Sequence, residues 1–503
     1  MRRNILQGFL SILGAQVTIL LISFLTTPFL VRFLGSSQYG DYAFLLSILS
    51  LTMIVANAGI FDGTRKYIAE DREQPNWIEH VFGFYIRMGF GLALAISFIY
   101  MALSWGGFSK QLFGEDFTVY FYLLGVLIIS RQAYSVVRGG LMGLGLEDRS
   151  EPLSVFKKVF FGLVSLSLAY LGYGVAGVLI GHIVASFTIA TIAFALLHQK
   201  MDSRVVFSRI PSSIPKRELL SFNTLSVVLI LLTASLYHVD ILLLRSIVGS
   251  EETGYYRAAL VIAEFLWFVP TSLQMVLLHS TSELWADNKT DQITNIVSRI
   301  TRYNLSLVIL LALGLAALAS DIIPLYFGSE FEPAVLPLLL LLPGVLGFAL
   351  ARPIFAVGQG KGDIRILIVA TGGSALLNFC LNILLIPRYG TAGAAIATSI
   401  SYGSMAVFHI FAAQKIGFNP ISNLKIKNIT STVVLSGGII FGISSIINSS
   451  FLSLIVVPPI GFAVYVALLI KLMVVSPQEV DEFTQHLPHS VRRYVRHFIN
   501  IVG

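Results

Sequence analysis

Fourteen long apolar stretches fill most of this chain of 503 residues. The hydrocarbon core of a bilayer is about 30 Å thick, and a helix needs roughly 20 apolar residues to cross it. Strands of a transmembrane barrel would be shorter and would alternate polar with apolar residues, so the stretches predict helices. The expected spans are residues 9–31, 41–63, 78–104, 117–138, 153–172, 175–198, 220–247, 254–284, 301–327, 333–356, 364–386, 391–414, 428–447 and 452–474.

The composition agrees with an integral membrane protein. Only 12% of the residues are charged, whereas soluble domains carry about 25%, so this chain cannot cover the surface of a soluble enzyme. The hydrophobic content of 55% also excludes an intrinsically disordered chain. Cys380 is the only cysteine, so an internal disulfide or a cysteine metal cluster is excluded. We expect an all-α integral membrane protein with no resident cofactor or metal.

The distribution of lysine and arginine predicts the orientation. With the N-terminus in the cytoplasm, 27 of the 34 Lys and Arg residues fall in cytoplasmic segments and five in exterior segments. Short cytoplasmic loops of membrane proteins carry such an excess. We therefore expect a multi-pass protein of the cell membrane with both termini in the cytoplasm. The net charge of +7 follows from this asymmetry and from loops that face anionic lipid, so it requires no nucleic-acid partner.

Three pairs of loop segments repeat in the same order at an offset of 214 to 216 residues. These pairs are 35–42 with 249–256, 138–148 with 352–363, and 173–177 with 389–393. The repeated unit contains six spans, and an even number returns the chain to the same side of the membrane. The two halves should therefore be related by an axis along the membrane normal, with a transport path between them.

This repeat predicts the domain organisation. The chain divides into a six-helix half at 1–200, a cytoplasmic linker at 201–218, a second six-helix half at 219–415, helices 13 and 14 within 416–474, and a cytoplasmic tail at 475–503. No polar segment is long enough to form a soluble catalytic domain, so we expect a transporter and not an enzyme.

Several of these segments together resemble one transporter family. FLGSSQYGDYAF follows the first span, GLGLED and GQGKGD follow the fourth and tenth, and IPRYGTAGAAIATSIS leads into the twelfth. With spans arranged as six, six and two, the chain resembles the oligosaccharide flippases of the multidrug/oligosaccharidyl-lipid/polysaccharide (MOP) exporter superfamily, which includes polysaccharide transporters. The resemblance extends over essentially the whole chain.

The resemblance implies a MATE-like fold and a function without covalent chemistry. Such flippases move a saccharide linked to a polyprenyl phosphate or diphosphate, undecaprenyl or dolichyl, from the cytoplasmic to the outer leaflet by alternating access. The product serves surface polysaccharide assembly or the N-glycosylation of proteins. The implied partners are the lipid-linked glycan, the bilayer and glycosyltransferases of the same pathway, and a single chain is expected to form the path as a monomer.

Ionisable residues inside the spans are the candidate site. Such a group near the bilayer centre costs at least about 2.5–3.5 kcal/mol and therefore faces a cavity or a partner. The candidates for binding the phosphate are Arg87, Arg131, Arg138 and Arg257, because arginine stays charged and binds phosphate with two parallel hydrogen bonds. Asp240 and Glu264 would couple transport to H⁺ or Na⁺ or balance the arginines. The alternative for both sets is a structural role in interhelical salt bridges.

Two asparagines and a histidine are weaker candidates. Asn378 and Asn382 lie one turn apart in one span and would contact sugar hydroxyls or, alternatively, form hydrogen bonds between helices. His182 lies within the span 175–198, where a histidine is more often a packing residue than a proton relay.

Two other functions compete with the flippase. A cation-coupled MATE-like exporter of drugs or small molecules belongs to the same superfamily, but deep arginines such as Arg87 and Arg131 favour an anionic lipid. A membrane-embedded glycosyltransferase or polymerase would need a large polar loop, which the spacing of the spans excludes.

Overall fold

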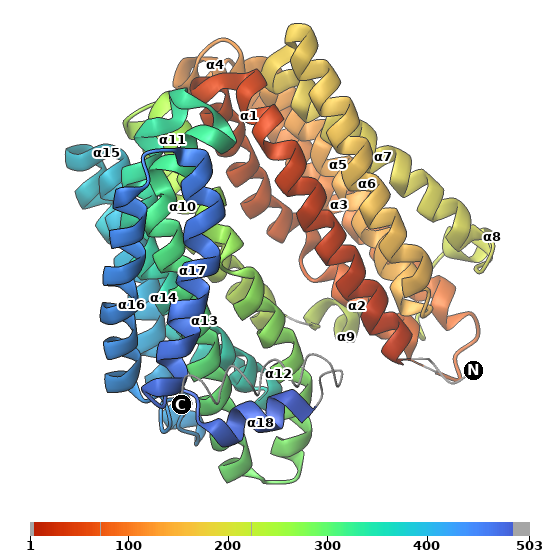
Figure 1. Ribbon diagram of the computed structural model, residues 1–503. Helices are drawn as coiled ribbons and strands as arrows, with labels where there is room; N and C mark the ends of the chain where they lie inside the picture. The colour runs from red at the N-terminus through yellow and green to blue at the C-terminus, as the bar shows by residue number, and fades with distance from the viewer. Residues whose placement is uncertain (1–4, 71, 223, 486–503) are drawn as a thin grey trace. The chain divides into compact units, whose positions relative to one another are not determined.

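The described part of the chain is helical, as the sequence predicts. The computed structural model describes residues 5–70, 72–222 and 224–485, and within these ranges it contains helices and connections but no strand (Figure 1). The chain forms two compact units, Met1–Gly254 and Tyr255–Gly503. We refer to these as the first unit and the second unit.

Among its described residues, the first unit contains ten α-helices, with one short π-helical segment between two of them, and the start of an eleventh. The helices are α1 (Ile5–Asn57), α2 (Ile60–Ala69), α3 (Trp77–Trp105), α4 (Phe108–Phe113), α5 (Phe117–Gly143), α6 (Glu147–Leu168), η1 (Ala169–Tyr173), α7 (Gly174–His198), α8 (Ser203–Val206), α9 (Lys216–Ser221) and α10 (Thr224–Ile247). Helix α11 (Ser250–Phe265) begins in the first unit and continues in the second.

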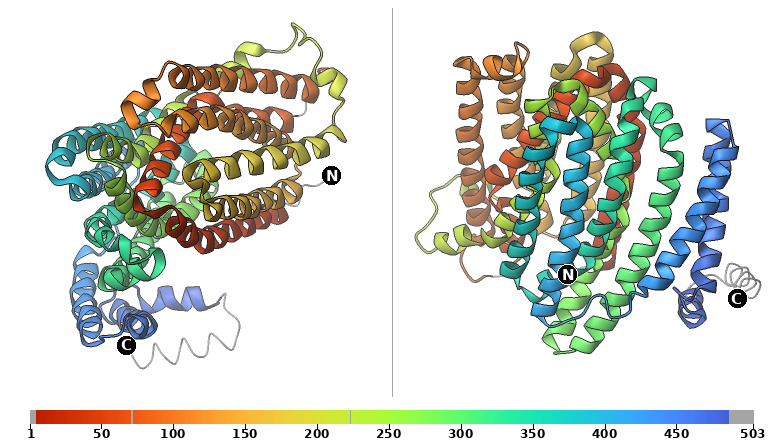
Figure 2. Two further views of the ribbon diagram at one scale, coloured as in Figure 1. Left: turned by 90° about the horizontal axis from the view of Figure 1, so that it is seen from above. Right: turned by 90° about the vertical axis from the view of Figure 1, so that its left-hand side faces the viewer.

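The second unit follows the same principle of long apolar helices joined by short turns. Its elements are α12 (Phe268–Ala286), α13 (Thr290–Phe327), η2 (Ser329–Ala334), α14 (Val335–Lys361), α15 (Ile364–Ile416), α16 (Ile426–Ile446), α17 (Ser450–Lys471) and α18 (Pro477–Gln485). Helices α16 and α17 run side by side in both views of Figure 2, and they pack on α13.

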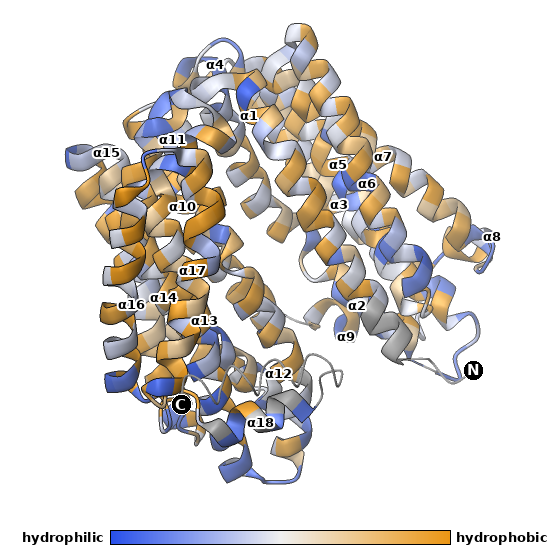
Figure 3. Ribbon diagram, in the orientation of Figure 1, coloured by the Kyte–Doolittle hydropathy of each residue, from blue (hydrophilic) through white to orange (hydrophobic). Residues whose placement is uncertain are grey.

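Among the described residues, ten helices are long and apolar enough to cross a membrane, and the bent pair of α11 and α12 would make eleven. Figure 3 shows mostly apolar turns along the long helices and hydrophilic residues gathered near their ends. Three candidates are 52 to 59 residues long: Ser11–Ala69, Glu147–His198 and Ile364–Ile416. Each is long enough for two crossings, since roughly 20 residues suffice for one. If each of the three crosses twice, the count rises to the fourteen spans that the sequence predicts.

Glycines break the helix at one position in α1 and at one in α15. Gly35 interrupts α1 with φ 70° and ψ 174°, and Gly390 interrupts α15 with φ 52° and ψ −129°. Side chains other than glycine rarely adopt a positive φ, so the chain can turn at these positions without steric cost. Both glycines belong to the repeated segments 35–42 and 389–393, which explains why these segments carry glycine.

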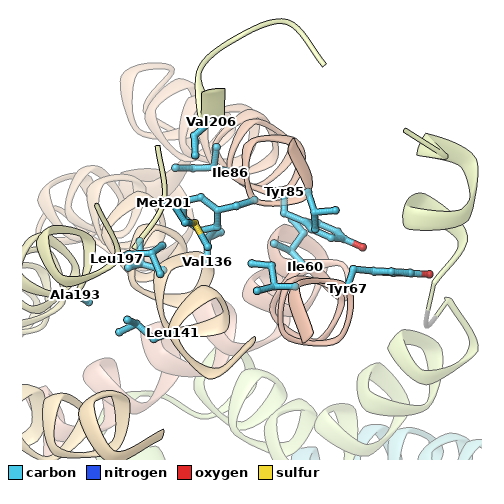
Figure 4. Packing of buried hydrophobic residues seen from close by; sticks show 14 of the residues in the cluster. Ile60, Tyr67, Tyr85, Ile86, Val136, Leu141, Ala193, Leu197, Met201 and Val206 are labelled. Carbon is cyan, nitrogen blue, oxygen red and sulfur yellow. The ribbon is translucent and has the colours of Figure 1, made fainter. Parts of the chain in front are cut away.

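The core of the first unit binds the segment that the sequence predicts as a linker. Met201, Val206 and Leu219 are buried against apolar side chains of α2, α3, α5 and α7, several of which appear in Figure 4. The Tyr85 hydroxyl donates a hydrogen bond of 3.1 Å to the carbonyl oxygen of Leu219. The predicted linker 201–218 and Leu219, the residue that follows it, are therefore held to the first unit through these buried side chains.

In the second unit, α16 and α17 are fastened to α13. Leu305, Ile429 and Tyr465 are buried together, and the Tyr465 hydroxyl donates a hydrogen bond of 2.8 Å to the carbonyl oxygen of Ser306. Of the tail predicted at 475–503, the structure describes residues up to 485, which form α18. Residues 486–503 lie outside the described ranges.

Candidate functional site

Three cations lie together midway along two helices of the first unit. Arg131 lies twelve residues before the end of α5 at Gly143, and Lys157 lies ten residues after the start of α6 at Glu147. At a rise of 1.5 Å per residue, both are about 15–18 Å from the turn that joins the helices. Arg131, Lys157 and Lys158 are partly buried and close enough for their charges to act on one another. We call these three residues the cation cluster.

Aromatic rings, rather than carboxylates, face the two lysines of the cation cluster. Lys157 Nζ lies 3.8 Å from the centre of the Tyr134 ring, and Lys158 Nζ lies 5.1 Å from the centre of the Phe161 ring. A cation over an aromatic face is stabilised by about 0.5–2 kcal/mol, which is less than the cost of a charge at depth. Within the described residues, none of the three cations forms an ion pair with a carboxylate. The cluster is therefore an uncompensated positive region in an apolar span.

His182 of α7 borders the cation cluster. Its Nε2 atom shares a hydrogen bond of 2.8 Å with the Tyr42 hydroxyl, and its ring stacks on Phe161 at 3.9 Å. These contacts agree with the packing role that the sequence favours for this histidine.

Two other predicted phosphate ligands make different contacts. Arg138 of α5 forms an ion pair of 2.7 Å with the buried carboxylate of Glu151 in α6. Arg87 of α3 donates hydrogen bonds of 2.9 and 2.5 Å to the carbonyl oxygens of Val206 and Ser208. Arg138 thus connects two helices, and Arg87 holds residues 206–208 against the first unit.

Arg257 and the two acidic candidates, Glu264 and Asp240, also form specific hydrogen bonds. Arg257 and Glu264 form a bidentate ion pair along α11, with hydrogen bonds of 2.9 and 3.2 Å. The two residues therefore share one helix face. Asp240 is fully buried in α10, where its Oδ1 atom accepts a hydrogen bond of 2.8 Å from the backbone amide of Ile241.

Asn378 and Asn382 are buried in the first limb of α15. The Asn378 side chain donates to Thr398 Oγ1 in the second limb at 3.4 Å, and the Asn382 side chain donates to the carbonyl oxygen of Asn378 at 3.0 Å. Thr398 also shares a hydrogen bond of 3.1 Å with Tyr256. The Asn378 contact is an interhelical hydrogen bond of the kind that the sequence offers as the alternative to sugar binding, whereas the Asn382 contact stays within the first limb.

Sequence reasoning missed two of the three members of the cation cluster. Lys157 and Lys158 are not among the candidates that the sequence provides, but the structure places them inside α6 near Arg131. The sequence signal that could have identified them is their position within the apolar stretch 153–172, because a charged side chain inside a span is expected to face a cavity or a partner. The hydrogen bond of 3.0 Å from Arg352 Nη1 to Gln274 Oε1 was also not predicted.

The described residues contain no group of three or more His, Cys, Asp or Glu side chains placed to hold a metal ion. The guanidinium and ammonium groups of the cation cluster can bind an anion. A phosphate suits such a site, because arginine binds it with two hydrogen bonds and lysine supplies a point charge.

Comparison with known proteins identifies a family and several relatives of this chain. Residues 29–336 match the family described as "Polysaccharide biosynthesis protein". The chain is 24% identical to the probable low-salt glycan biosynthesis flippase Agl15 of Haloferax volcanii over 458 residues, which cover 88% of this chain and 91% of the relative.

Solved structures show the same fold. The inward closed conformation of the lipid II flippase MurJ superposes with a TM-score of 0.73 at 15% identity, covering 90% of this chain and 96% of MurJ. An inward-facing multidrug resistance MATE transporter of the MOP superfamily gives a TM-score of 0.66 at 15% identity, covering 80% of this chain and 95% of the transporter. The chain is an all-helical multi-pass membrane protein with a MATE/MurJ-like fold, as the sequence predicts.

Proposed function

Because the chain belongs to the polysaccharide biosynthesis protein family, whose model covers more than half of it, we propose that it is a flippase for lipid-linked saccharides. Its substrate is a saccharide carried on a polyprenyl phosphate or diphosphate, with undecaprenyl or dolichyl as the lipid. It moves this substrate from the cytoplasmic to the outer leaflet by alternating access, for surface polysaccharide or N-glycan assembly. The relatives described above are named as flippases or as a transporter and not as enzymes.

The cation cluster is the observation that carries this proposal. Three cations midway along α5 and α6, without a carboxylate ion pair among the described residues, cost free energy inside a membrane unless a ligand neutralises them. A phosphate or diphosphate is the anion that a lipid-linked saccharide brings into the membrane. Arg131 binds it through two hydrogen bonds, and Lys157 and Lys158 neutralise the remaining charge.

The other residues predicted from the sequence are further candidates for contact with the substrate or for ion coupling. Arg87, Arg138 and Arg257 are further candidates for contact with the phosphate during the cycle, and each holds a defined partner in this conformation. Asp240 and Glu264 are candidates for H⁺ or Na⁺ coupling or for charge balance, and Asn378 and Asn382 for contact with the sugar. In this scheme both termini lie in the cytoplasm, and the two sequence halves 1–200 and 219–415 move against each other.

A deletion in the native host tests the proposal. Lipid-linked glycans are extracted and surface glycosylation is measured. The expected result is accumulation of a complete lipid-linked glycan facing the cytoplasm and loss of its mature form outside. Re-expression of the parent chain should restore export. A variant with Arg131→Ala and Lys157→Ala should not restore it, although it reaches the membrane in equal amount.

The same experiment separates the flippase from a MATE-like exporter. Unchanged glycolipids together with greater drug sensitivity would overturn the flippase and favour cation-coupled export of small molecules. The resemblance of the fold to a MATE transporter supports that alternative only at the level of architecture. The cation cluster favours an anionic substrate over the cationic compounds that an acidic cavity would bind.

A further inference from the structure

A groove runs along the helix hairpin α15 in the second unit. The hairpin consists of a first limb, residues 364–389, and a second limb, residues 391–416, joined at the break at Gly390. The groove between the limbs has a volume of about 480 Å³. This volume lies within the range of about 300–1,000 Å³ that is typical of sites for small organic ligands. We call it the α15 groove.

The walls of the α15 groove are apolar and uncovered. Val369 of the first limb is 75% exposed and Phe411 of the second limb is 63% exposed. Gly373 forms part of the floor, where a Cβ atom would lie 3.2 Å from the ring of Phe408. Exposed apolar surface of this kind marks a site of contact with a membrane or another partner.

Two cations close one end of the groove. Arg365 is the second residue of α15 and Lys415 is its second-to-last residue, so the turn at Gly390 brings both to the same end of the hairpin. Both side chains are exposed, and neither forms an ion pair with a carboxylate in the described part of the chain. Asp363, the neighbouring acid, is paired with Lys361 at 3.3 Å.

We propose that the α15 groove binds an anionic glycerophospholipid. One acyl chain lies in the groove against Val369, Gly373 and Phe411, and the phosphate lies against Arg365 and Lys415. The charge pattern selects this ligand, because a hydrocarbon chain fills an apolar groove and an anionic headgroup sits at its cationic end. Basic pockets between transmembrane helices bind anionic lipid headgroups in this way. The inference requires a membrane-embedded chain but not the flippase activity.

Native mass spectrometry of the purified full-length chain tests the proposal. The detergent-solubilised protein is mixed with phosphatidylglycerol or, in parallel, with phosphatidylcholine, which has the same acyl chains and no net charge. We expect one retained phosphatidylglycerol and little retained phosphatidylcholine. The Arg365→Ala/Lys415→Ala variant should bind phosphatidylglycerol about tenfold more weakly, since both headgroup contacts are lost.

Two variants separate the headgroup contact from the groove and from general charge. Arg388→Ala removes an exposed cation from the opposite end of the same hairpin and should retain the lipid like the parent chain. Gly373→Leu fills the floor of the groove while both cations stay, and it should reduce binding through loss of the acyl-chain contact. The Arg365→Lys/Lys415→Arg variant keeps both charges and should retain binding, which shows that loss in the alanine variant is not misfolding.

Three results would overturn the proposal. The double alanine variant could retain phosphatidylglycerol as the parent chain does. All variants could carry the same series of multiple adducts, which would indicate adventitious annular lipid only. A dimer mass would assign the groove to a second copy of the chain. None of these results bears on flipping, which the glycan assay measures separately.

Discussion

Gly40 packs against the segment that contains Gly254, and Gly254 packs against the segment that contains Gly40, so closely that neither position has room for a side chain. A Cβ atom on Gly40 would lie 1.8 Å from the carbonyl oxygen of Ser250, and one on Gly254 would lie 2.0 Å from the carbonyl oxygen of Ser36. The two glycines hold equivalent positions in the repeated segments 35–42 and 249–256. The repeated sequence therefore packs on its own copy, with reciprocal contacts of the kind found in a twofold interface.

Substitution at this contact should destabilise the first unit. Gly40→Ala places a Cβ against backbone atoms, which cannot move independently, and overpacking of this kind costs about 1–3 kcal/mol. We expect a lower midpoint of thermal unfolding in detergent for Gly40→Ala and for Gly254→Ala. Gly91→Ala is the matched control, because nothing lies within 4 Å of a Cβ at that helical position. Equal midpoints for Gly40→Ala and Gly91→Ala would contradict the close packing.

An ion pair lies beside this contact. Arg245 Nε and Asp41 Oδ1 are 2.6 Å apart with both side chains largely buried, and Ser250 Oγ donates a hydrogen bond of 2.8 Å to the same carboxylate oxygen. Asp41→Ala should lower the free energy of unfolding by about 3 kcal/mol, since it leaves a buried guanidinium unpaired.

The charge swap Asp41→Arg/Arg245→Asp provides the control for this ion pair. It should recover part of the loss in thermal unfolding, because it restores opposite charges at the two positions. A swap that is no more stable than Asp41→Arg alone would show that the pair does not contribute through its charges.

The cation cluster should lower the thermal stability of the chain and should be required for transport. Lys157→Met removes one of three like charges and keeps the aliphatic length, so the thermal midpoint should stay the same or rise. Glycan export should fall, because a charge-assisted bond worth about 1.5–3 kcal/mol corresponds to about a ten- to hundredfold change in phosphate binding.

Lys110→Met is the matched control for the cation cluster. Lys110 is exposed and paired with Glu115 at 2.6 Å, so its loss should leave export unchanged. A Lys157→Met variant that unfolds early but exports normally would reverse both expectations and would indicate a structural role for the cluster.

Acid should release α18 from α13. Burial of Glu479 opposes its ionisation, but the hydrogen bond from the Ser476 backbone amide and the charge of buried Arg302 outweigh this and hold the Glu479 pKa below its ordinary value of 4.5. A pKa that is lowered by folding contributes stability that is present above 4.5 and is lost as the pH falls below it.

Hydrogen exchange of residues 477–485 measures this release. Protection should be constant near neutral pH and should decrease below about pH 4.5 as Glu479 takes up a proton. Glu479→Gln should lower protection at neutral pH and remove most of the acid dependence. Identical pH profiles for the parent chain and Glu479→Gln would contradict the role of this carboxylate.

Much of the fold follows from local chemistry. The membrane-spanning helices are predicted by the length of the apolar stretches. The breaks at Gly35 and Gly390 occur within the repeated segments 35–42 and 389–393. Part of the charge pairing was also predictable, because Arg257 and Glu264 lie two turns apart on one helix. Helical spacing alone brings such residues onto the same face.

Contacts between helices were not predictable in the same way. The spacing of Lys157 within the chain gives no sign that it faces Tyr134, and the nearest carboxylate in sequence to Arg138 is not its partner. Likewise, the side chain of Arg87 extends to the carbonyl oxygens of Val206 and Ser208, which lie more than a hundred residues away.

The sequence by itself determined that the chain spans a membrane as helices, that it is internally repeated, and to which family it belongs. These properties depend on composition, periodicity and order, which a linear chain carries completely. Only the tertiary structure decided that Glu151 neutralises Arg138 while Arg131 is joined by Lys157 and Lys158. The free energy of a charge at membrane depth depends on atoms within a few ångströms, and the rotation and register of packed helices decide which atoms those are.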